Sequence, residues 1–259
     1  MAETTLRGRL VWHELMTTDP KAAEPFYAGV IGWSTAPFEG IGMPYTMWMR
    51  GEMPEGGLMV LTEQERQAGV PPNWLMYVGT PDVDTTAREA ETLGGRVVVP
   101  PTDIPNVGRF AVLADPQGAV FAAHTSANPS PAPDGPPLVG QFSWHELATS
   151  DSEAALAFYG ALFGWAVTRT EDLGALGLYR MFGSGGFTLG GVLTMPPDMG
   201  VPPNWLLYVR VADIERAADE VRARGGQVLT GPHEVPGGDW VAKCLDPQGA
   251  AFALHQRKA

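Results

Sequence analysis

The sequence contains a single cysteine, few basic residues and no long apolar run. With only Cys244 among 259 residues, an internal disulfide and a cysteine-rich zinc site are both excluded, and a reducing compartment is expected. The 17 Lys and Arg residues against 29 Asp and Glu residues give a formal charge of -12. Because phosphate binding requires clustered basic side chains, nucleic acid and membrane are excluded as partners. With no signal peptide or membrane-spanning run, we expect a cytoplasmic protein that meets a small-molecule ligand or substrate.

What the sequence does contain is a long internal repeat. The motif WHEL at residues 12–15 recurs at 144–147, an offset of 132. The stretch PPNWLMYV at 71–78 recurs as PPNWLLYV at 202–209, an offset of 131. The FY, GW and DPQG motifs recur at the same two offsets. A period of this length is that of a domain, so the chain is a tandem duplication.

The repeat divides the chain into two expected domains. The first covers residues 1–125, a Pro-rich linker follows at 126–138, and the second covers 139–259. In each half a strand leads to an aspartate suited to cap a helix, Asp19 or Asp151, and short strands follow. The same order then begins again within each half. We therefore predict an α+β fold in which each domain is a pair of βαβββ units.

The motifs in this order, occurring twice, resemble the vicinal oxygen chelate superfamily, which includes glyoxalase I, bleomycin-resistance proteins, fosfomycin-resistance enzymes and extradiol dioxygenases. The form WHEL…TTD…FY…GW is most similar to the two-domain glyoxalase-like proteins often labelled hydroxylases. The resemblance implies paired βαβββ units that form half-open barrels with helices outside. It also implies that the fused halves supply the pseudo-twofold pairing internally, as a monomer or as a homodimer.

The resemblance places divalent-metal ligands on the first and last strands of the units. Here those positions hold no metal-binding side chain, since they are occupied by Trp12, Trp144, Leu75, Leu206, Ala122 and Ala253. Indole and aliphatic side chains do not bind Mg²⁺, Zn²⁺ or Fe²⁺. The sequence therefore predicts no cofactor and a metal-independent site.

A shifted Glu/His site is the alternative to that prediction. Glu14 and Glu146 lie two residues beyond the first-strand positions, and His124 and His255 lie two residues beyond the last-strand positions. Because side chains alternate along a strand, all four face the same side as the missing ligands. They would suit a divalent metal or a carboxylate–histidine acid/base pair.

Two other interpretations remain open for these positions. Glu14 and Glu146 could serve only structure, by accepting hydrogen bonds from the backbone or from Asn73 and Asn204. The aromatic residues of the same strands could form a core, or a slot for a flat ligand together with the two asparagines. The slot would be formed by Trp12, Trp74, Tyr77, Trp144, Trp205 and Tyr208.

Three functions follow from these alternatives. The protein acts on a small organic molecule, an aromatic compound or secondary metabolite among the candidates, without the usual metal. Alternatively, it sequesters such a compound unchanged, as bleomycin-resistance proteins do. In the third alternative it is a metal-dependent lyase or dioxygenase that uses the shifted Glu/His site. Whether the protein is an enzyme stays open at this point.

Overall fold

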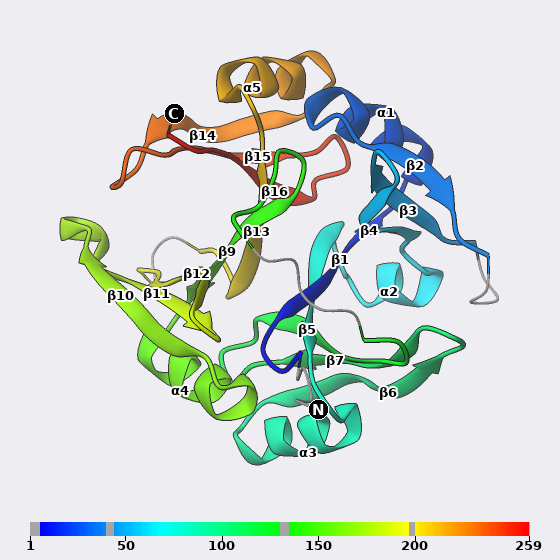
Figure 1. Cartoon of the computed structure of the whole chain (residues 1–259), viewed down its shortest axis with the longest axis vertical. Helices are drawn as coiled ribbons and strands as arrows, with labels where there is room; N and C mark the ends of the chain where they lie inside the picture. Colours follow the sequence, from blue (N-terminus) through cyan, green and yellow to red (C-terminus); the bar gives the residue numbers. More distant parts are fainter. Residues whose placement is uncertain (1–5, 40–43, 130–134, 197–199, 259) are drawn as a thin grey trace. The chain divides into compact units, whose positions relative to one another are not determined.

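The computed structural model describes residues 6–39, 44–129, 135–196 and 200–258, which form four βαβββ units (Figure 1). The first unit is β1 (Leu10–Thr17), α1 (Pro20–Val30), β2 (Ser34–Pro37), β3 (Thr46–Arg50) and β4 (Met53–Val60). The second, after the short helix α2 (Glu63–Gln67), is β5 (Asn73–Gly79), α3 (Val83–Thr92), β6 (Arg96–Ile104), β7 (Gly108–Ala114) and β8 (Val120–Ser126). The predicted α+β architecture is confirmed.

The second repeat has the same order. Its first unit is β9 (Phe142–Thr149), α4 (Ser152–Phe163), β10 (Ala166–Asp172), β11 (Leu178–Ser184) and β12 (Phe187–Thr194), with the 3₁₀ turn η1 (Gly174–Leu176) before β11. Its second unit is β13 (Asn204–Arg210), α5 (Ile214–Ala223), β14 (Gln227–Glu234), β15 (Trp240–Leu245) and β16 (Ala251–Gln256). The edge strands β2 and β10 were not predicted, because they have little apolar patterning.

The strands form two eight-stranded mixed sheets, in the orders β2-β3-β4-β1-β5-β8-β7-β6 and β10-β11-β12-β9-β13-β16-β15-β14. Within each βαβββ unit the first and last strands are parallel, and the remaining neighbours are antiparallel. This arrangement follows from the crossover helix, which returns the chain to the same end of the sheet. Moving two residues along either the first or the last strand therefore keeps the side chain on the same face of the sheet. Because these strands are parallel, the displacement has the same direction on both.

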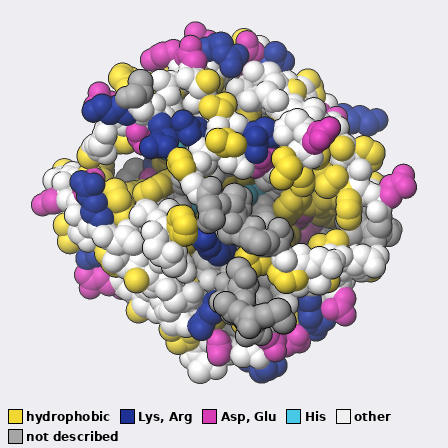
Figure 2. Space-filling model, in the orientation of Figure 1, with side chains coloured by type: hydrophobic (Ala, Val, Ile, Leu, Met, Phe, Trp, Pro, Cys, Tyr) yellow, Lys and Arg dark blue, Asp and Glu magenta, His cyan; other side chains and the backbone are white. Residues whose placement is uncertain are grey.

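Aspartate caps begin the longer helices. Asp19 accepts a hydrogen bond from the Ala22 amide, and Pro20 occupies the first helical position of α1. Asp151 accepts from the first amides of α4, which ends at Gly164 in the left-handed conformation. None of the described helices is long and apolar enough to cross a membrane. Lys and Arg side chains are interspersed with Asp and Glu on the face that Figure 2 draws.

The contacts divide the chain into two compact units that do not follow the order of the repeats. One, called the inner pair because it holds the second and third βαβββ units in sequence order, contains the described residues of 1–11, 76–134 and 144–205. The other, the outer pair, contains 12–75, 135–143 and 206–259, the first and fourth units. In the outer pair α1 lies beside α5, and in the inner pair α3 lies beside α4 (Figure 1). The division at residues 126–138 stays a prediction about folding domains.

In the outer pair, the FY motif of the first repeat packs on the DPQG turn of the second. Phe26 and Tyr27 of α1 contact the ring of Phe252 at centroid distances of 5.9 and 5.4 Å. The Tyr27 hydroxyl donates to Asp246 Oδ2 at 3.1 Å and accepts from Trp74 Nε1 at 2.9 Å. Tyr27 has no exposed surface, so this network lies in the core.

The inner pair contains the same network with the repeats exchanged. Phe158 and Tyr159 of α4 pack on Phe121, and the Tyr159 hydroxyl donates to Asp115 Oδ2 at 3.0 Å. Trp205 Nε1 donates to the same hydroxyl at 3.1 Å. Both aspartates also accept backbone amides of their own DPQG turns. The FY and DPQG motifs therefore join one repeat to the other.

Candidate functional site

A hydrogen-bonded array of three side chains, here called the first array, lies on the first βαβββ unit. Trp12 Nε1 donates to the Tyr45 hydroxyl at 2.8 Å, and this hydroxyl donates to Glu14 Oε2 at 2.9 Å. Glu14 is only 6% exposed, whereas Trp12 and Tyr45 are half-buried. A buried carboxylate is therefore bordered by two aromatic side chains that solvent reaches.

The second array repeats this arrangement on the third unit. Trp144 Nε1 donates to the Tyr179 hydroxyl at 2.8 Å, and this hydroxyl donates to Glu146 Oε2 at 3.2 Å. Glu146 is 8% exposed, and its two partners are again half-buried. The predicted carboxylates thus have tyrosine partners that sequence reasoning missed.

The strand register explains how the tyrosine reaches the carboxylate. Glu14 pairs with Gly57 on β4, and Gly57 pairs with Met47 on β3, so the three form one row across the sheet. Tyr45 lies two residues before Met47 and crosses the row over Gly57, where a Cβ atom would overlap its hydroxyl oxygen. In the second repeat the row is Glu146, Gly191 and Met181, and a Cβ atom on Gly191 would overlap the Tyr179 ring. The hydrogen bond between tyrosine and glutamate therefore requires a glycine at position 57 in the first repeat and at position 191 in the second.

Substituting Gly57 with alanine is expected to lower the free energy of unfolding by about 2 kcal/mol, because the methyl group displaces the Tyr45 side chain from Glu14. Chemical denaturation of Gly57→Ala measures this loss. In the double variant with Tyr45→Ala the added cost of the methyl group should largely disappear, since the two side chains no longer compete for the same space. Strictly additive losses would show that the tyrosine does not depend on the glycine.

Electrostatics keep both tyrosines protonated as donors. Burial, followed by the negative charge of Glu14, raises the pKa of the Tyr45 phenol. Burial and Glu146 raise the pKa of Tyr179 in the same way, with a further contribution from Glu171. The phenol proton of each array is therefore held between two oxygens, that of the phenol and that of the carboxylate.

The histidines that precede these glutamates in the sequence, His13 and His145, point to the opposite side of the strand. The His13 ring stacks on Phe142 at a centroid distance of 3.8 Å. His145 Nδ1 donates to the Leu189 carbonyl oxygen at 3.1 Å. Both histidines are buried, at 9% and 5% exposed. The strand alternation expected from the sequence separates each of them from its neighbouring glutamate.

His145 predicts an acid-side loss of stability. Burial lowers the pKa of His145 from 6.5 to about 4. The unfolded chain therefore binds more protons than the folded chain between these values, and the free energy of unfolding falls as the pH drops through that window, by about 3 kcal/mol in total. Denaturation of His145→Gln from pH 7 to pH 4 should show a flatter profile than the parent. The matched control His233→Gln, at an exposed position, should keep the parent profile; an unchanged profile in His145→Gln would contradict the assignment.

The two last-strand histidines have different surroundings. His255 Nδ1 lies 2.8 Å from the Ser143 hydroxyl, and its Nε2 lies 3.0 Å from Asp239 Oδ2. Both of its ring nitrogens are thus engaged, by partners the sequence did not indicate. Burial lowers the pKa of His124, whose ring contacts Tyr77 edge-on at 6.4 Å. The Glu–His acid/base pair stays a prediction.

The expected slot residues divide between core and surface. Trp74 and Trp205 are 5% and 7% exposed and donate to the core tyrosines described above. Tyr77 and Tyr208 are also buried. Asn73 and Asn204 donate to nearby proline carbonyls, those of Pro71 and Pro202. Only Trp12 and Trp144 of the expected slot belong to the two arrays, and the ligand-binding role of the other residues stays a prediction.

The donor set does not fit the metal that the family's enzymes use. Trp12 and Trp144 stand at the positions that the resemblance assigns to the first-strand ligands, and their indole N–H groups donate to tyrosine. Ala122 and Ala253, at the last-strand positions, pair with Tyr77 and Tyr208. Among the residues that the structure describes, no group of three or more His, Cys, Asp or Glu side chains could hold a metal ion.

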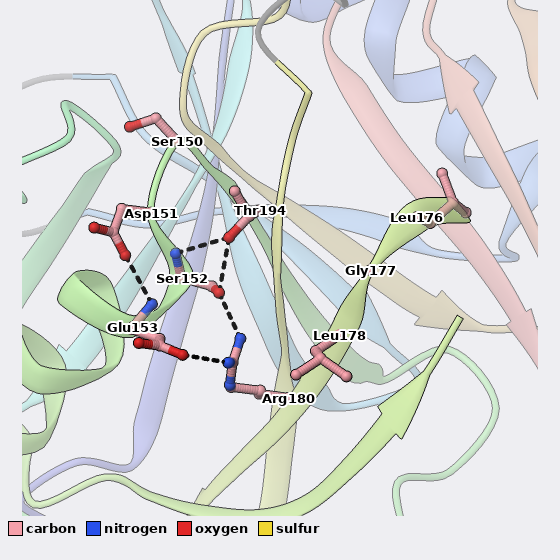
Figure 3. A pocket seen from close by; sticks show the side chains of 9 residues that line it. All are labelled: Ser150, Asp151, Ser152, Glu153, Leu176, Gly177, Leu178, Arg180 and Thr194. Carbon is pink, nitrogen blue, oxygen red and sulfur yellow. Dashed lines mark hydrogen bonds and ion pairs between the residues drawn. The ribbon is translucent and has the colours of Figure 1, made fainter. Parts of the chain in front are cut away.

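An open pocket of about 290 Å³ lies at the start of α4, and no residue of the second array lines it (Figure 3). Arg180 donates to the Ser152 hydroxyl and to the Glu153 carboxylate across it. The amides of Glu153 and Ala154 already donate to the capping Asp151. Since these groups satisfy one another, the pocket offers no free set of donors for an anion.

Comparisons with known proteins place the chain in one family. Residues 141–254 match the glyoxalase/bleomycin resistance protein/dioxygenase superfamily, and residues 12–124 match a glyoxalase-like domain. The chain is 34% identical over 261 residues to a protein of Mycobacterium tuberculosis named "Putative glyoxylase CFP32", with 96% of this chain and 94% of that protein covered. It is 30% identical to the anthracycline biosynthesis protein DnrV of Streptomyces peucetius, with coverages of 95% and 92%.

The fold is similar to that of the Mn(II)-bound glyoxalase from Novosphingobium aromaticivorans. The TM-score is 0.63 at 16% identity, with 96% of this chain and 82% of the other covered. At this identity the likeness concerns the fold alone. Taken with the matches to both repeats and the full-length relatives, these findings show that the chain belongs to the glyoxalase/bleomycin resistance protein/dioxygenase superfamily.

Proposed function

We propose that this protein binds a small organic molecule at its two Trp–Tyr–Glu arrays, and that the carboxylates meet the ligand without a divalent metal. One observation carries the proposal. In both repeats a buried glutamate is bordered by a tyrosine and a tryptophan that are only half-buried. A buried carboxylate is costly unless it is paired, and its recurrence in both repeats beside accessible aromatic surface is characteristic of a binding site.

The chemistry of the array indicates the kind of ligand. Carboxylate oxygens only accept hydrogen bonds, and a phenol oxygen that has donated its proton can still accept. The half-buried indole of Trp12 or Trp144 offers a flat apolar surface. A planar molecule that carries hydroxyl or amine donors matches both features. The names of DnrV and of DauV, a second relative at 29% identity, refer to anthracycline biosynthesis and support an aromatic secondary metabolite as the ligand.

The replacement of the family's metal ligands supports direct binding. Metal-dependent relatives would use a divalent ion to meet ligand oxygens, whereas the equivalent first-strand residue here is Trp12, which donates to Tyr45. The ligand's own donors then take the place of the metal next to Glu14. Under this proposal the ligand is held unchanged, as in sequestration, and conversion to a product would instead identify an acid–base enzyme built on the same glutamates.

Titration with quinizarin, a dihydroxylated anthraquinone, tests the proposal. We expect the compound to quench tryptophan fluorescence at saturable sites in the presence of excess EDTA. Removing both carboxylates with Glu14→Gln and Glu146→Gln should weaken binding at least about tenfold, because each loses a charge-assisted hydrogen bond. The matched control Glu91→Gln changes an exposed glutamate on α3 and should bind as the parent does.

Two results would contradict the proposal. One is unchanged affinity in the double Glu14→Gln, Glu146→Gln variant. The other is binding that EDTA abolishes and a divalent metal restores, which would favour the shifted Glu/His site instead. Chromatography of the recovered quinizarin separates binding from turnover, since a sequestered compound elutes unaltered.

A further inference from the structure

The two arrays have different neighbours on the edge strand. In the first repeat, the residue opposite Tyr45 is Phe38, whose amide donates to the Tyr45 carbonyl at 2.9 Å and whose ring lies 6.2 Å from the tyrosine ring. In the second repeat, the residue opposite Tyr179 is Glu171 on β10. Residues opposite one another in an antiparallel pair point to the same side of the sheet. An apolar ring therefore flanks the first array, and a second carboxylate flanks the other.

Glu171 is more buried than its place on an edge strand requires. Six of the seven residues of β10 are exposed, whereas the Glu171 side chain is 13% exposed. Its Oε1 atom is inaccessible to solvent and makes no hydrogen bond of good geometry, although it lies 2.7 Å from Nη2 of Arg169. Arg169 is 65% exposed, and an ion pair with so exposed a partner contributes little. Since Oε1 itself is inaccessible, Glu171 keeps capacity to accept from a ligand through the 13% of its side chain that is exposed.

The Glu171 carboxylate interacts electrostatically with Tyr179 of the second array. Glu171 contributes to the raised pKa of Tyr179, after burial and Glu146, so its carboxylate lies close enough to the phenol to affect it. Tyr45 has no such second carboxylate among the causes of its pKa shift. Glu146 and Glu171 both lie next to Tyr179, to which the half-buried Trp144 donates, so the second repeat combines two carboxylates with an aromatic face. Protonated amines are recognised by this combination, through charge-assisted hydrogen bonds and cation–π contact.

We propose that the second array, with Glu171, binds the protonated amine of a cationic aromatic ligand, whereas the first array, with Phe38, prefers an uncharged one. This inference rests on the proposed function, because it assigns a ligand class to each of the two binding arrays. The two repeats then share a binding geometry and differ in the charge that they accept.

A matched pair of probes tests the inference, naphthylmethylamine and naphthylmethanol, which differ by an ammonium and a hydroxyl group on the same ring system. In the Glu14→Gln background, where the second array remains, calorimetry should show the amine binding about tenfold more tightly than the alcohol. Glu171→Gln should remove most of that difference and leave the affinity for the alcohol within about twofold. Asp172→Asn, the same charge change on the next, exposed residue of β10, is the matched control and should keep the preference.

The reciprocal change makes the test sharper. In the Glu146→Gln background, where the first array remains, Phe38→Glu should create an amine preference that the parent array lacks. Equal binding of both probes in the Glu14→Gln background, or a preference that survives Glu171→Gln, would overturn the inference while the proposed function stands. Binding of neither probe to the unmodified protein would count against the proposed function itself, and the inference would fall with it.

Discussion

Replacing Tyr27 with phenylalanine is expected to lower the free energy of unfolding by about 2 kcal/mol, although only one oxygen atom is lost. The hydroxyl links Asp246 Oδ2 and Trp74 Nε1 inside the outer pair, and its removal leaves both groups buried without that partner. Tyr27→Ala should cost more, about 4 kcal/mol, because the ring packs against several other aromatic rings. Denaturant titration of the purified variants measures both losses.

The repeat supplies the matched comparison for this prediction. Tyr159 makes the same two bonds in the inner pair, to Asp115 and Trp205, so Tyr159→Phe should cost about as much as Tyr27→Phe. Because the two sites lie in different compact units, the losses should add in the double variant. A loss below about 0.5 kcal/mol in both single variants would show that these networks do not hold the repeats together.

Cutting the chain between its repeats is expected to leave one folded particle. Each compact unit takes one βαβββ unit from each repeat, so a cut in the linker separates partners that share a core. With a protease site inserted after the exposed Asn128, both fragments should co-elute in size-exclusion chromatography after cleavage. The cleaved protein should also keep the parent far-UV circular dichroism spectrum. Either fragment made alone should lack a cooperative unfolding transition, because half of each core is missing.

The alternative outcome bears on the division at residues 126–138. If the fragments separate and each unfolds cooperatively, the repeats are the folding domains, as the sequence predicts. Uncleaved protein carrying the same insertion is the control for any effect of the inserted site. The elution volume of the uncleaved protein gives the size of the particle and so tests the expectation of a monomer or a homodimer.

The sequence predicts the elements of this fold better than their partners. Duplicated motifs, helix caps and the alternation of strands are local signals, and they identified four βαβββ units. The hydrogen bond between Tyr27 and Asp246 joins residues far apart in the chain. A repeated sequence does not show whether its βαβββ units pair within one half of the chain or between the two halves. Side-chain packing between units determines which of them pair, and the hydrophobic periodicity of the sequence carries no information about that packing.

The candidate site was predicted in part. Alternation along the strand placed Glu14 and Trp12 on one side, and both belong to the first array. Tyr45 was missed because its counterpart Tyr179 lies at an offset of 134 residues, outside the two offsets that align the repeats. The shared pattern Tyr-x-Met, followed by Gly-Gly on the next strand, was the available signal. Its meaning depends on cross-strand register, which the sequence alone does not give.

A crystal structure of the protein with quinizarin, grown with EDTA, would show whether a glutamate meets the ligand without a metal. We expect the ring system to lie against Trp12 or Trp144, with a ligand hydroxyl within hydrogen-bond distance of Glu14 or Glu146 and no metal between them. Anomalous scattering from a divalent ion bound between the ligand and a glutamate or histidine would contradict it. Ligand density away from both arrays would contradict it as well.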